Sequence, residues 1–187
     1  KVNAEVFRYS IRGMVDDIRF KSYEAPFNSD TFFWTSFTPR QGFQRRDEYD
    51  RYLARLRDVP RHFDEQVTNM RAGLARGFTV PRVAVEGRDK TIEPYVKGDT
   101  TNPLYLPFLQ MPASIPADQQ AALRAEAMGV VRDVVAPAYA RLLAMIRNEY
   151  LPRARTTLAA TSATGKLLSA QSIVVASTTS TEQSGLF

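Results

Sequence analysis

The chain has 187 residues, of which 44% are hydrophobic and 24% are charged. A chain of this length can bury the core of one domain, and the composition is typical of globular rather than disordered proteins. The sequence has no cysteine, which excludes disulfides, thiolate zinc sites and cysteine nucleophiles. No apolar run approaches the roughly 20 residues of a membrane-spanning helix, so we expect no membrane span.

The net charge of +5 raises the question of nucleic-acid binding, because clustered basic side chains neutralise phosphates. The basic residues are mostly arginines, and they alternate with Asp and Glu instead of forming a block. We interpret them as a solvated surface and do not expect a nucleic-acid partner. The chain starts at Lys1 rather than Met, which indicates a removed leader or a start within a longer protein.

The first predicted element is an amphipathic helix over residues 4–23. Asn3 can serve as its N-cap. Its apolar residues recur every three or four positions and so share one face, with charged residues opposite. This apolar stripe consists of Phe7, Ile11, Met14, Val15 and Ile18.

Residues 25–46 lose this period and combine turn-forming residues with large aromatic side chains. Each aromatic contributes roughly 1.5–3 kcal/mol if it is buried, so we expect an irregular segment that packs on the chain's own helices. Two alternatives are a contact with missing parts of a larger protein and the lining of a substrate cleft. The aromatic residues are Phe27, Phe32, Phe33, Trp34, Phe37 and Phe43.

A second helical stretch begins near Asp47, its predicted cap, and Pro60 starts a further helix because proline suits the first turn. This helix should end just before Gly77. Pro81 opens another helix, which ends within residues 94–98.

Four prolines make residues 99–116 a rigid connector. The longest helical pattern covers about residues 116–150, with a kink at Pro137 and an end at Pro152. Residues 159–187 are rich in Ser and Thr, and we expect a mostly disordered tail, within which 167–176 could form a short strand or amphipathic turn. The predicted fold is an all-α, irregular helical bundle with kinked long helices and Pro- and aromatic-rich connecting loops, formed by residues 1–158.

Candidate catalytic residues are few. An H-E-x-x-H zinc site needs two imidazoles one helical turn apart, and the only histidine is His62. It follows Pro60 in a first helical turn, and no nucleophile is marked for it, so we interpret it as a partly exposed surface residue.

Three further groups have structural interpretations. The acidic neighbours Asp16/Asp17, Asp47/Glu48 and Asp64/Glu65 diverge on a helix and form solvated faces. Gly73 and Gly77 belong to a helix end rather than a phosphate-binding loop. Tyr49, Tyr52, Tyr139 and Tyr150 are interpreted as packing. We therefore predict no catalytic, cofactor-binding or metal-ligating residue in this sequence.

Three stretches go beyond a general helical pattern: DRYLARLRDVPRHFDEQVTNMRAGLARGFTVPR at residues 50–82, PLYLPF at 103–108 and VAPAYARLLAMIRNEYLPRAR at 135–155. Together they resemble the N-terminal half of the bacterial family called domain of unknown function 885, over about residues 3–158. The resemblance implies a helical protein whose full-length relatives look like zinc metallopeptidases with an H-E-x-x-H helix further downstream. By this resemblance the chain is a helical wall or scaffold of a hydrolase cleft. Zinc is implied only for the full-length relatives, and no activity is expected of this chain alone.

The tail departs from the family pattern, because relatives continue from YLPRAR through a glycine into an aromatic stretch. Here Gly165 and Lys166 are followed by LLSAQSIVVASTTSTEQSGLF. Two explanations stay open: a shifted frame or premature end that lost the metal-binding half, and a natural short paralogue with its own tail.

The resemblance also bears on partners and location. It implies a peptide substrate or the missing C-terminal half as partner, and a surface that faced that half would favour self-association. Several relatives look exported, as periplasmic proteins or lipoproteins. A different class of function is a helical protein- or peptide-binding module that uses the aromatic loop 26–43.

Overall fold

The computed structural model describes residues 2–27, 32–39, 41–156, 160–161 and 167–168. These residues confirm the predicted all-α fold with bent long helices. The strands β1 (Ala160–Thr161) and β2 (Leu167–Leu168) pair antiparallel, with Ala160 opposite Leu168. They fall in the predicted tail, whose other residues lie outside the described ones.

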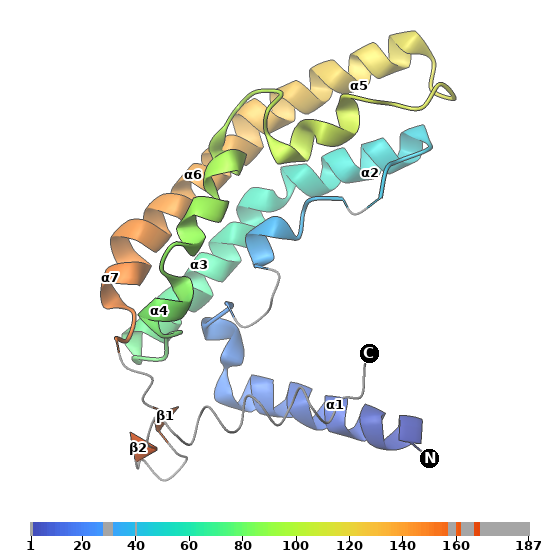
Figure 1. Cartoon of the computed structure of the whole chain (residues 1–187). Coiled ribbons are helices and arrows are strands. Elements are labelled where there is room, and N and C mark those ends of the chain that lie inside the picture. The colour runs from blue at the N-terminus through green and yellow to red at the C-terminus, as the bar shows by residue number, and fades with distance from the viewer. Residues whose placement is uncertain (1, 28–31, 40, 157–159, 162–166, 169–187) are drawn as a thin grey trace.

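Two long helical rods lie side by side and form the body of the molecule (Figure 1). Because α2 packs against α5 and α3 against α6, both rods run in the same direction. The first rod consists of α2 (Arg46–Arg57) and α3 (Val59–Ala75); the second consists of α5 (Ala117–Val130), η6 (Val131–Val135), α6 (Ala136–Met145), η7 (Ile146–Tyr150) and α7 (Leu151–Arg153).

The second rod contains two π-helical segments, η6 and η7. A proline lies two residues after the end of each segment, Pro137 after η6 and Pro152 after η7. A proline in an α-helix lacks an N–H and clashes with the carbonyl four residues earlier. In both cases that carbonyl, of Asp133 or Asn148, lies in the wider π-helical turn. The π-helical turns therefore accommodate both prolines within one continuous helix, which ends one residue after Pro152.

A return segment carries the chain back between the two rods, since parallel rods need a long connection. It consists of α4 (Arg82–Val85), η3 (Arg88–Thr91), η4 (Glu93–Val96) and η5 (Pro103–Phe108). The predicted single helix after Pro81 is wrong, because Gly87 adopts a left-handed φ of 81° and divides it. η4 packs on α6 and η5 on α5, which places this segment along the second rod.

The aromatic segment packs on the chain's own helices, as predicted, within its described residues. It contains η1 (Ser22–Glu24) and η2 (Phe33–Thr35). Phe27, Trp34 and Phe37 are buried in the common core. The Trp34 indole Nε1 donates a hydrogen bond to the Thr91 hydroxyl at 3.0 Å, which joins this segment to the return segment.

The first helix, α1 (Val2–Phe20), diverges from the body (Figure 1). Its existence confirms the prediction, but its apolar stripe is solvent-exposed instead of packed, with Ile18 72% and Phe7 66% exposed. Lys21 follows with a left-handed φ of 55°. Arg76 of the α3 C-terminus donates to the Phe20 carbonyl at 2.9 Å, so the described hydrogen bond between α1 and the body lies at the C-terminal end of α1.

The ends of the first rod show one wrong and one correct prediction. Asp47 is not the cap of α2, because the helix begins at Arg46, directly after the extended N-cap residue Arg45. Glu48 in the first turn accepts the N–H groups of Gln44 and Arg45 at 2.7 and 3.0 Å. Gly77 does follow α3, with a left-handed φ of 70°. The Phe78 N–H bonds to the Gly73 carbonyl at 2.8 Å, which completes a Schellman motif.

Candidate functional site

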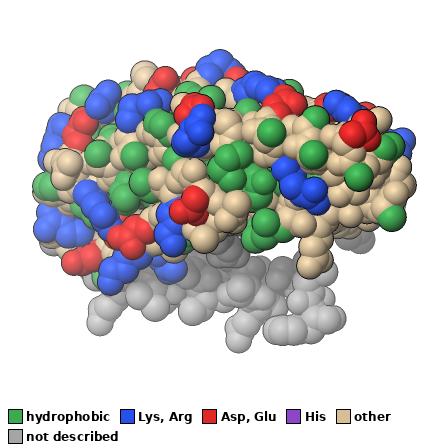
Figure 2. Space-filling model, turned by 90° about the horizontal axis from the view of Figure 1, so that it is seen from above, with side chains coloured by type: hydrophobic (Ala, Val, Ile, Leu, Met, Phe, Trp, Pro, Cys, Tyr) green, Lys and Arg blue, Asp and Glu red, His purple; other side chains and the backbone are tan. Residues whose placement is uncertain are grey.

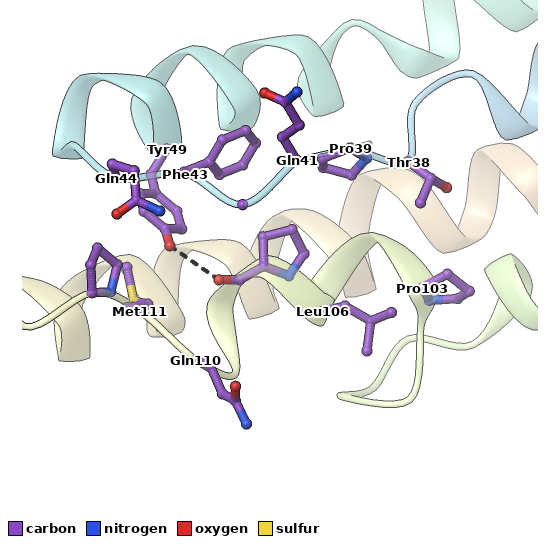
Figure 3. Close-up of a pocket in the computed structure, with 13 residues that line it drawn as sticks. Thr38, Pro39, Gln41, Phe43, Gln44, Tyr49, Pro103, Leu106, Gln110 and Met111 are labelled. Carbon is purple, nitrogen blue, oxygen red and sulfur yellow. Dashed lines mark hydrogen bonds between the residues drawn. The ribbon is translucent and has the colours of Figure 1, made fainter.

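An open groove of about 480 Å³ lies between the loop 38–44 and the connector 103–112 (Figure 3). The two segments run side by side, and Gln41 and Gln110 extend from them in opposite directions, so that amide groups lie at both edges of the groove. None of the lining side chains is charged. They are Thr38, Pro39, Gln41, Gly42, Phe43, Gln44, Tyr49, Pro103, Leu106, Pro107, Gln110, Met111 and Pro112.

Tyrosines on α2 fasten the η5 wall of the groove. The Tyr49 hydroxyl donates to the Pro107 carbonyl at 3.2 Å, and the Tyr52 hydroxyl donates to the Leu104 carbonyl at 3.1 Å. Burial raises the pKa of both phenols, so both stay protonated near neutral pH. Phe43 packs its ring on both tyrosines, with centroids 5.0 and 5.1 Å away. The same side chains therefore position both walls.

Asn102 positions the start of η5. Its side chain is fully buried, and Oδ1 accepts the Leu104 N–H at 3.0 Å as an N-cap. Its Nδ2 donates to the carbonyls of Tyr95 and Lys97 at 2.9 and 2.7 Å. Because Pro103 follows as the first helical residue, the capping pair is already visible in the sequence. This Asn-Pro signal could have predicted the turn.

A second recess, of about 560 Å³, lies on the other side of the same loop. It shares Gln41 and Phe43 with the groove but also includes Glu48, Arg51 and Arg55. These charged groups have partners: Arg51 pairs with Asp47 at 2.8 Å, and Arg55 donates to the Ser36 carbonyl at 2.9 Å. The backbone N–H groups of Gln44 and Arg45 donate to the Glu48 carboxylate and lower its pKa. The charged side chains Glu48 and Arg55 of this recess therefore hold the neighbouring loop segments by hydrogen bonds to their backbone.

His62 lies away from the lining residues of both recesses. It is half-buried, and its ring meets those of Phe33 and Phe37 edge-on at centroid distances of 6.1 and 5.5 Å. Burial lowers its pKa. The environment is aromatic, and no nucleophile lies in hydrogen-bond contact with it among the described residues. The sequence predicted a partly exposed surface residue, and the half-buried ring is partly exposed.

The other candidate residues also have structural surroundings. Asp16 and Asp17 are exposed on α1, and Glu65 pairs with Arg61. Tyr139 donates to the Trp34 carbonyl, while Tyr150 accepts the Val80 N–H at 3.2 Å. The tyrosines thus fasten irregular segments to the rods, a packing role that agrees with their interpretation.

The described residues do not fit a zinc site. Nowhere in this part of the chain do three or more His, Cys, Asp or Glu side chains gather where they could hold a metal ion. Carboxylates are instead committed to arginines, as in the pair of Arg71 with Glu149 at 2.9 Å across the two rods. Basic and acidic side chains intermix over the face shown in Figure 2. None of the helices in the described part is long and apolar enough to cross a membrane.

The sequence model of one family, described as "Bacterial protein of unknown function (DUF885)", matches residues 1–181. The chain belongs to this family. The match confirms the resemblance and extends beyond residue 158. The predicted boundary between the helical part and the tail at residue 158 lies outside the described residues and stays a prediction. No curated protein and no solved structure matches this DUF885 chain.

The groove itself was missed by sequence reasoning. Its walls, residues 38–44 and 103–112, are far apart in the chain, and they are joined by the hydrogen bond between Tyr49 and Pro107, which lie 58 positions apart. The only local signal was the PLYLPF stretch, where Leu106 is 54% exposed between the buried Tyr105 and Phe108. An apolar residue that breaks a buried pattern in this way marks a contact surface only once the fold is known.

Proposed function

We propose that this DUF885 chain is a non-catalytic helical wall of a metallopeptidase-like hydrolase, and that it contributes the groove at 38–44 and 103–112 as a rest for an extended peptide segment. The observation that carries the proposal is the groove's lining, which is free of charged side chains and rich in proline and glutamine. The metallopeptidase part rests on the family resemblance alone.

The chemistry of the groove suits a neutral polypeptide. Its volume of about 480 Å³ falls in the range of small-molecule and peptide pockets, roughly 300–1,000 Å³. Glutamine amides both donate and accept hydrogen bonds, as a peptide backbone requires. In the described part of the chain no hydrogen bond engages the side-chain amides of Gln41 and Gln110, and Leu106 offers exposed apolar contact.

The test is binding of a fluorescent, terminally blocked, uncharged octapeptide of Leu, Gln and Pro to the full chain, followed by anisotropy. Leu106→Asp places a charge in the groove and should weaken binding by about tenfold or more, since a desolvated charge is costly. Leu109→Asp is the matched control, because Leu109 is similarly exposed (48%) but does not line the groove. It should change affinity less than about twofold. Equal effects of the two substitutions would refute the site.

The non-catalytic part has its own readout. The chain is incubated with the same peptide and zinc, and hydrolysis is followed by chromatography. We expect none above the rate in buffer, and turnover that Leu106→Asp abolishes would contradict the proposal.

A stand-alone binding module is the second candidate, and the same groove supports it. The aromatic rings of the loop 26–43 are packed inward, so such a module would use the stretch 38–44 of that loop. The two candidates differ in strength: a module binds its peptide tightly without other parts, whereas one wall of a cleft holds it weakly. A dissociation constant in the low micromolar range or below would favour the module.

A further inference from the structure

Within the described part of the chain, the stripe on α1 is the most exposed apolar surface. It is formed by Phe7, Ile11, Met14, Val15 and Ile18, which are 66%, 44%, 64%, 57% and 72% exposed. Together they leave roughly 500 Å² of apolar surface in water, at the upper end of the largest patch on a typical monomer. Such a continuous patch indicates a partner surface rather than scattered exposed residues.

The helix itself also needs a partner. An isolated helix of 19 residues is only marginally stable in water. α1 has Gly13 at its centre and several β-branched residues, both unfavourable to a lone helix. Its packing contacts with the body are concentrated at η1, beyond its C-terminal end. Packing on the stripe is therefore the missing source of stability for α1.

We propose that the stripe pairs antiparallel with the stripe of a second copy of this chain, with Phe7 opposite Ile18 of the second copy and Ile11 opposite Met14. The stripe residues 7, 11, 14 and 18 are spaced by four, three and four, which is the spacing of alternating core positions in a coiled coil. In an antiparallel pair, a core position of one type (7 or 14) faces a core position of the other type (11 or 18) on the second helix. This register makes four layers of two apolar side chains and buries about 1,000 Å² in total, the lower bound of a specific interface.

The surroundings of the stripe favour this orientation. A hollow of about 530 Å³ adjoins its C-terminal half and is lined by Met14, Ile18, Tyr23 and Pro26, among others. In the antiparallel register the hollow receives Phe7 of the second copy, a side chain of suitable size and polarity. The body is attached at the C-terminal end of α1 (Figure 1), so antiparallel pairing places the two bodies at opposite ends, whereas parallel pairing crowds them together.

The helix dipoles favour the same arrangement, because an antiparallel pair brings the N-terminal end of each α1 beside the C-terminal end of the other.

The first measurement is sedimentation velocity of the full chain over a range of concentrations. We expect a concentration-dependent dimer. Ile11→Arg should raise the dissociation constant by about tenfold or more, because it introduces a charge at a central layer. Tyr9→Arg is the matched control: it adds the same charge to the same helix on the opposite face, at a residue 80% exposed, and should change the constant less than about twofold.

The register is tested by cross-linking, which is simple because the chain has no native cysteine. Phe7→Cys and Ile18→Cys chains are treated with a short bis-maleimide, separately and mixed. We expect covalent dimers in the mixture and few in either chain alone. A monomer at every concentration, a dimer insensitive to Ile11→Arg, equal effects of both arginine variants, or cross-links in each single variant alone would overturn the proposal.

Discussion

Replacing Asn102 with Asp is expected to destabilise the η5 wall of the groove in a pH-dependent way. The buried Asn102 amide donates two hydrogen bonds, to the carbonyl oxygens of Tyr95 and Lys97 at 2.9 and 2.7 Å, and accepts one from the Leu104 N–H. Aspartate retains the acceptor. When it is ionised, however, its second oxygen faces two carbonyl oxygens and has no proton to donate.

The magnitude and the sign follow from these contacts. Two lost hydrogen bonds cost about 1 kcal/mol each, and the buried, unpaired carboxylate brings the total to about 3–5 kcal/mol at pH 7. Burial and the two carbonyl dipoles raise the pKa of this carboxyl in the folded state above its unfolded value of about 3.9. A raised folded pKa means that stability is retained below the unfolded pKa and lost as the pH rises through the folded pKa. The penalty relative to wild type should therefore grow from about pH 4 to pH 7.

The assay is urea unfolding of the wild type, Asn102→Asp and Asn102→Ala at several pH values in this range. Asn102→Ala removes the two donated hydrogen bonds and also the acceptor of the Leu104 N–H, without introducing a titratable group. Its cost of about 2–3 kcal/mol should stay constant relative to wild type. Equal pH dependence of the two variants would refute the assignment of the Asn102 donors to the two carbonyls.

Three further predictions concern stability, each measured by chemical unfolding. Gly73→Ala should cost about 1–3 kcal/mol, because its Cβ would lie 2.6 Å from the backbone oxygens of Glu24 and Phe78. Gly129→Ala, in open space within α5, is the control and should stabilise the protein by about 0.5–1 kcal/mol. Similar changes in the free energy of unfolding for both variants would contradict the close approach at Gly73. Tyr49→Phe should cost about 1 kcal/mol and leave the fold intact by circular dichroism, and no loss would mean that its hydrogen bond to η5 is replaced by water. Glu48→Gln should reduce the loss of stability as the pH falls below about 4.5, since the folded pKa of Glu48 is lowered; an acid profile unchanged from wild type would oppose this.

Periodicity predicted the helices well because burial and helical spacing coincide in most of them. The stripe of α3 illustrates this, as Phe63, Met70 and Leu74 are all buried. The same reasoning found α1 but could not tell that its stripe faces water, since the period places side chains on a face and does not say what covers it. The groove could not be predicted either, because its walls meet through the tertiary hydrogen bond between Tyr49 and Pro107.

Local conformation was harder to predict where one residue decides it. Pro137 was expected to kink the longest helix, and the structure adds that a π-helical turn precedes this proline and lets the helix continue past it. Gly87 divides a predicted helix because its left-handed conformation is available to glycine at no steric cost. Both outcomes depend on which of two permitted geometries the surrounding packing selects, and the sequence pattern alone does not rank them.

The distribution of polar partners among the described residues supports the proposed role of this chain as a wall or contact surface. The hydroxyls of Tyr49 and Tyr52 end on backbone carbonyls, and arginines such as Arg71 and Arg147 end on carboxylates of neighbouring elements. Groups held in this way have fixed protonation and geometry and serve to fasten one segment to another. Two surfaces are left over among the described residues, the neutral amide-edged groove and the apolar stripe of α1. Each can recognise a polypeptide by shape, hydrogen bonding or apolar burial, and neither brings together an acid, a base and a nucleophile.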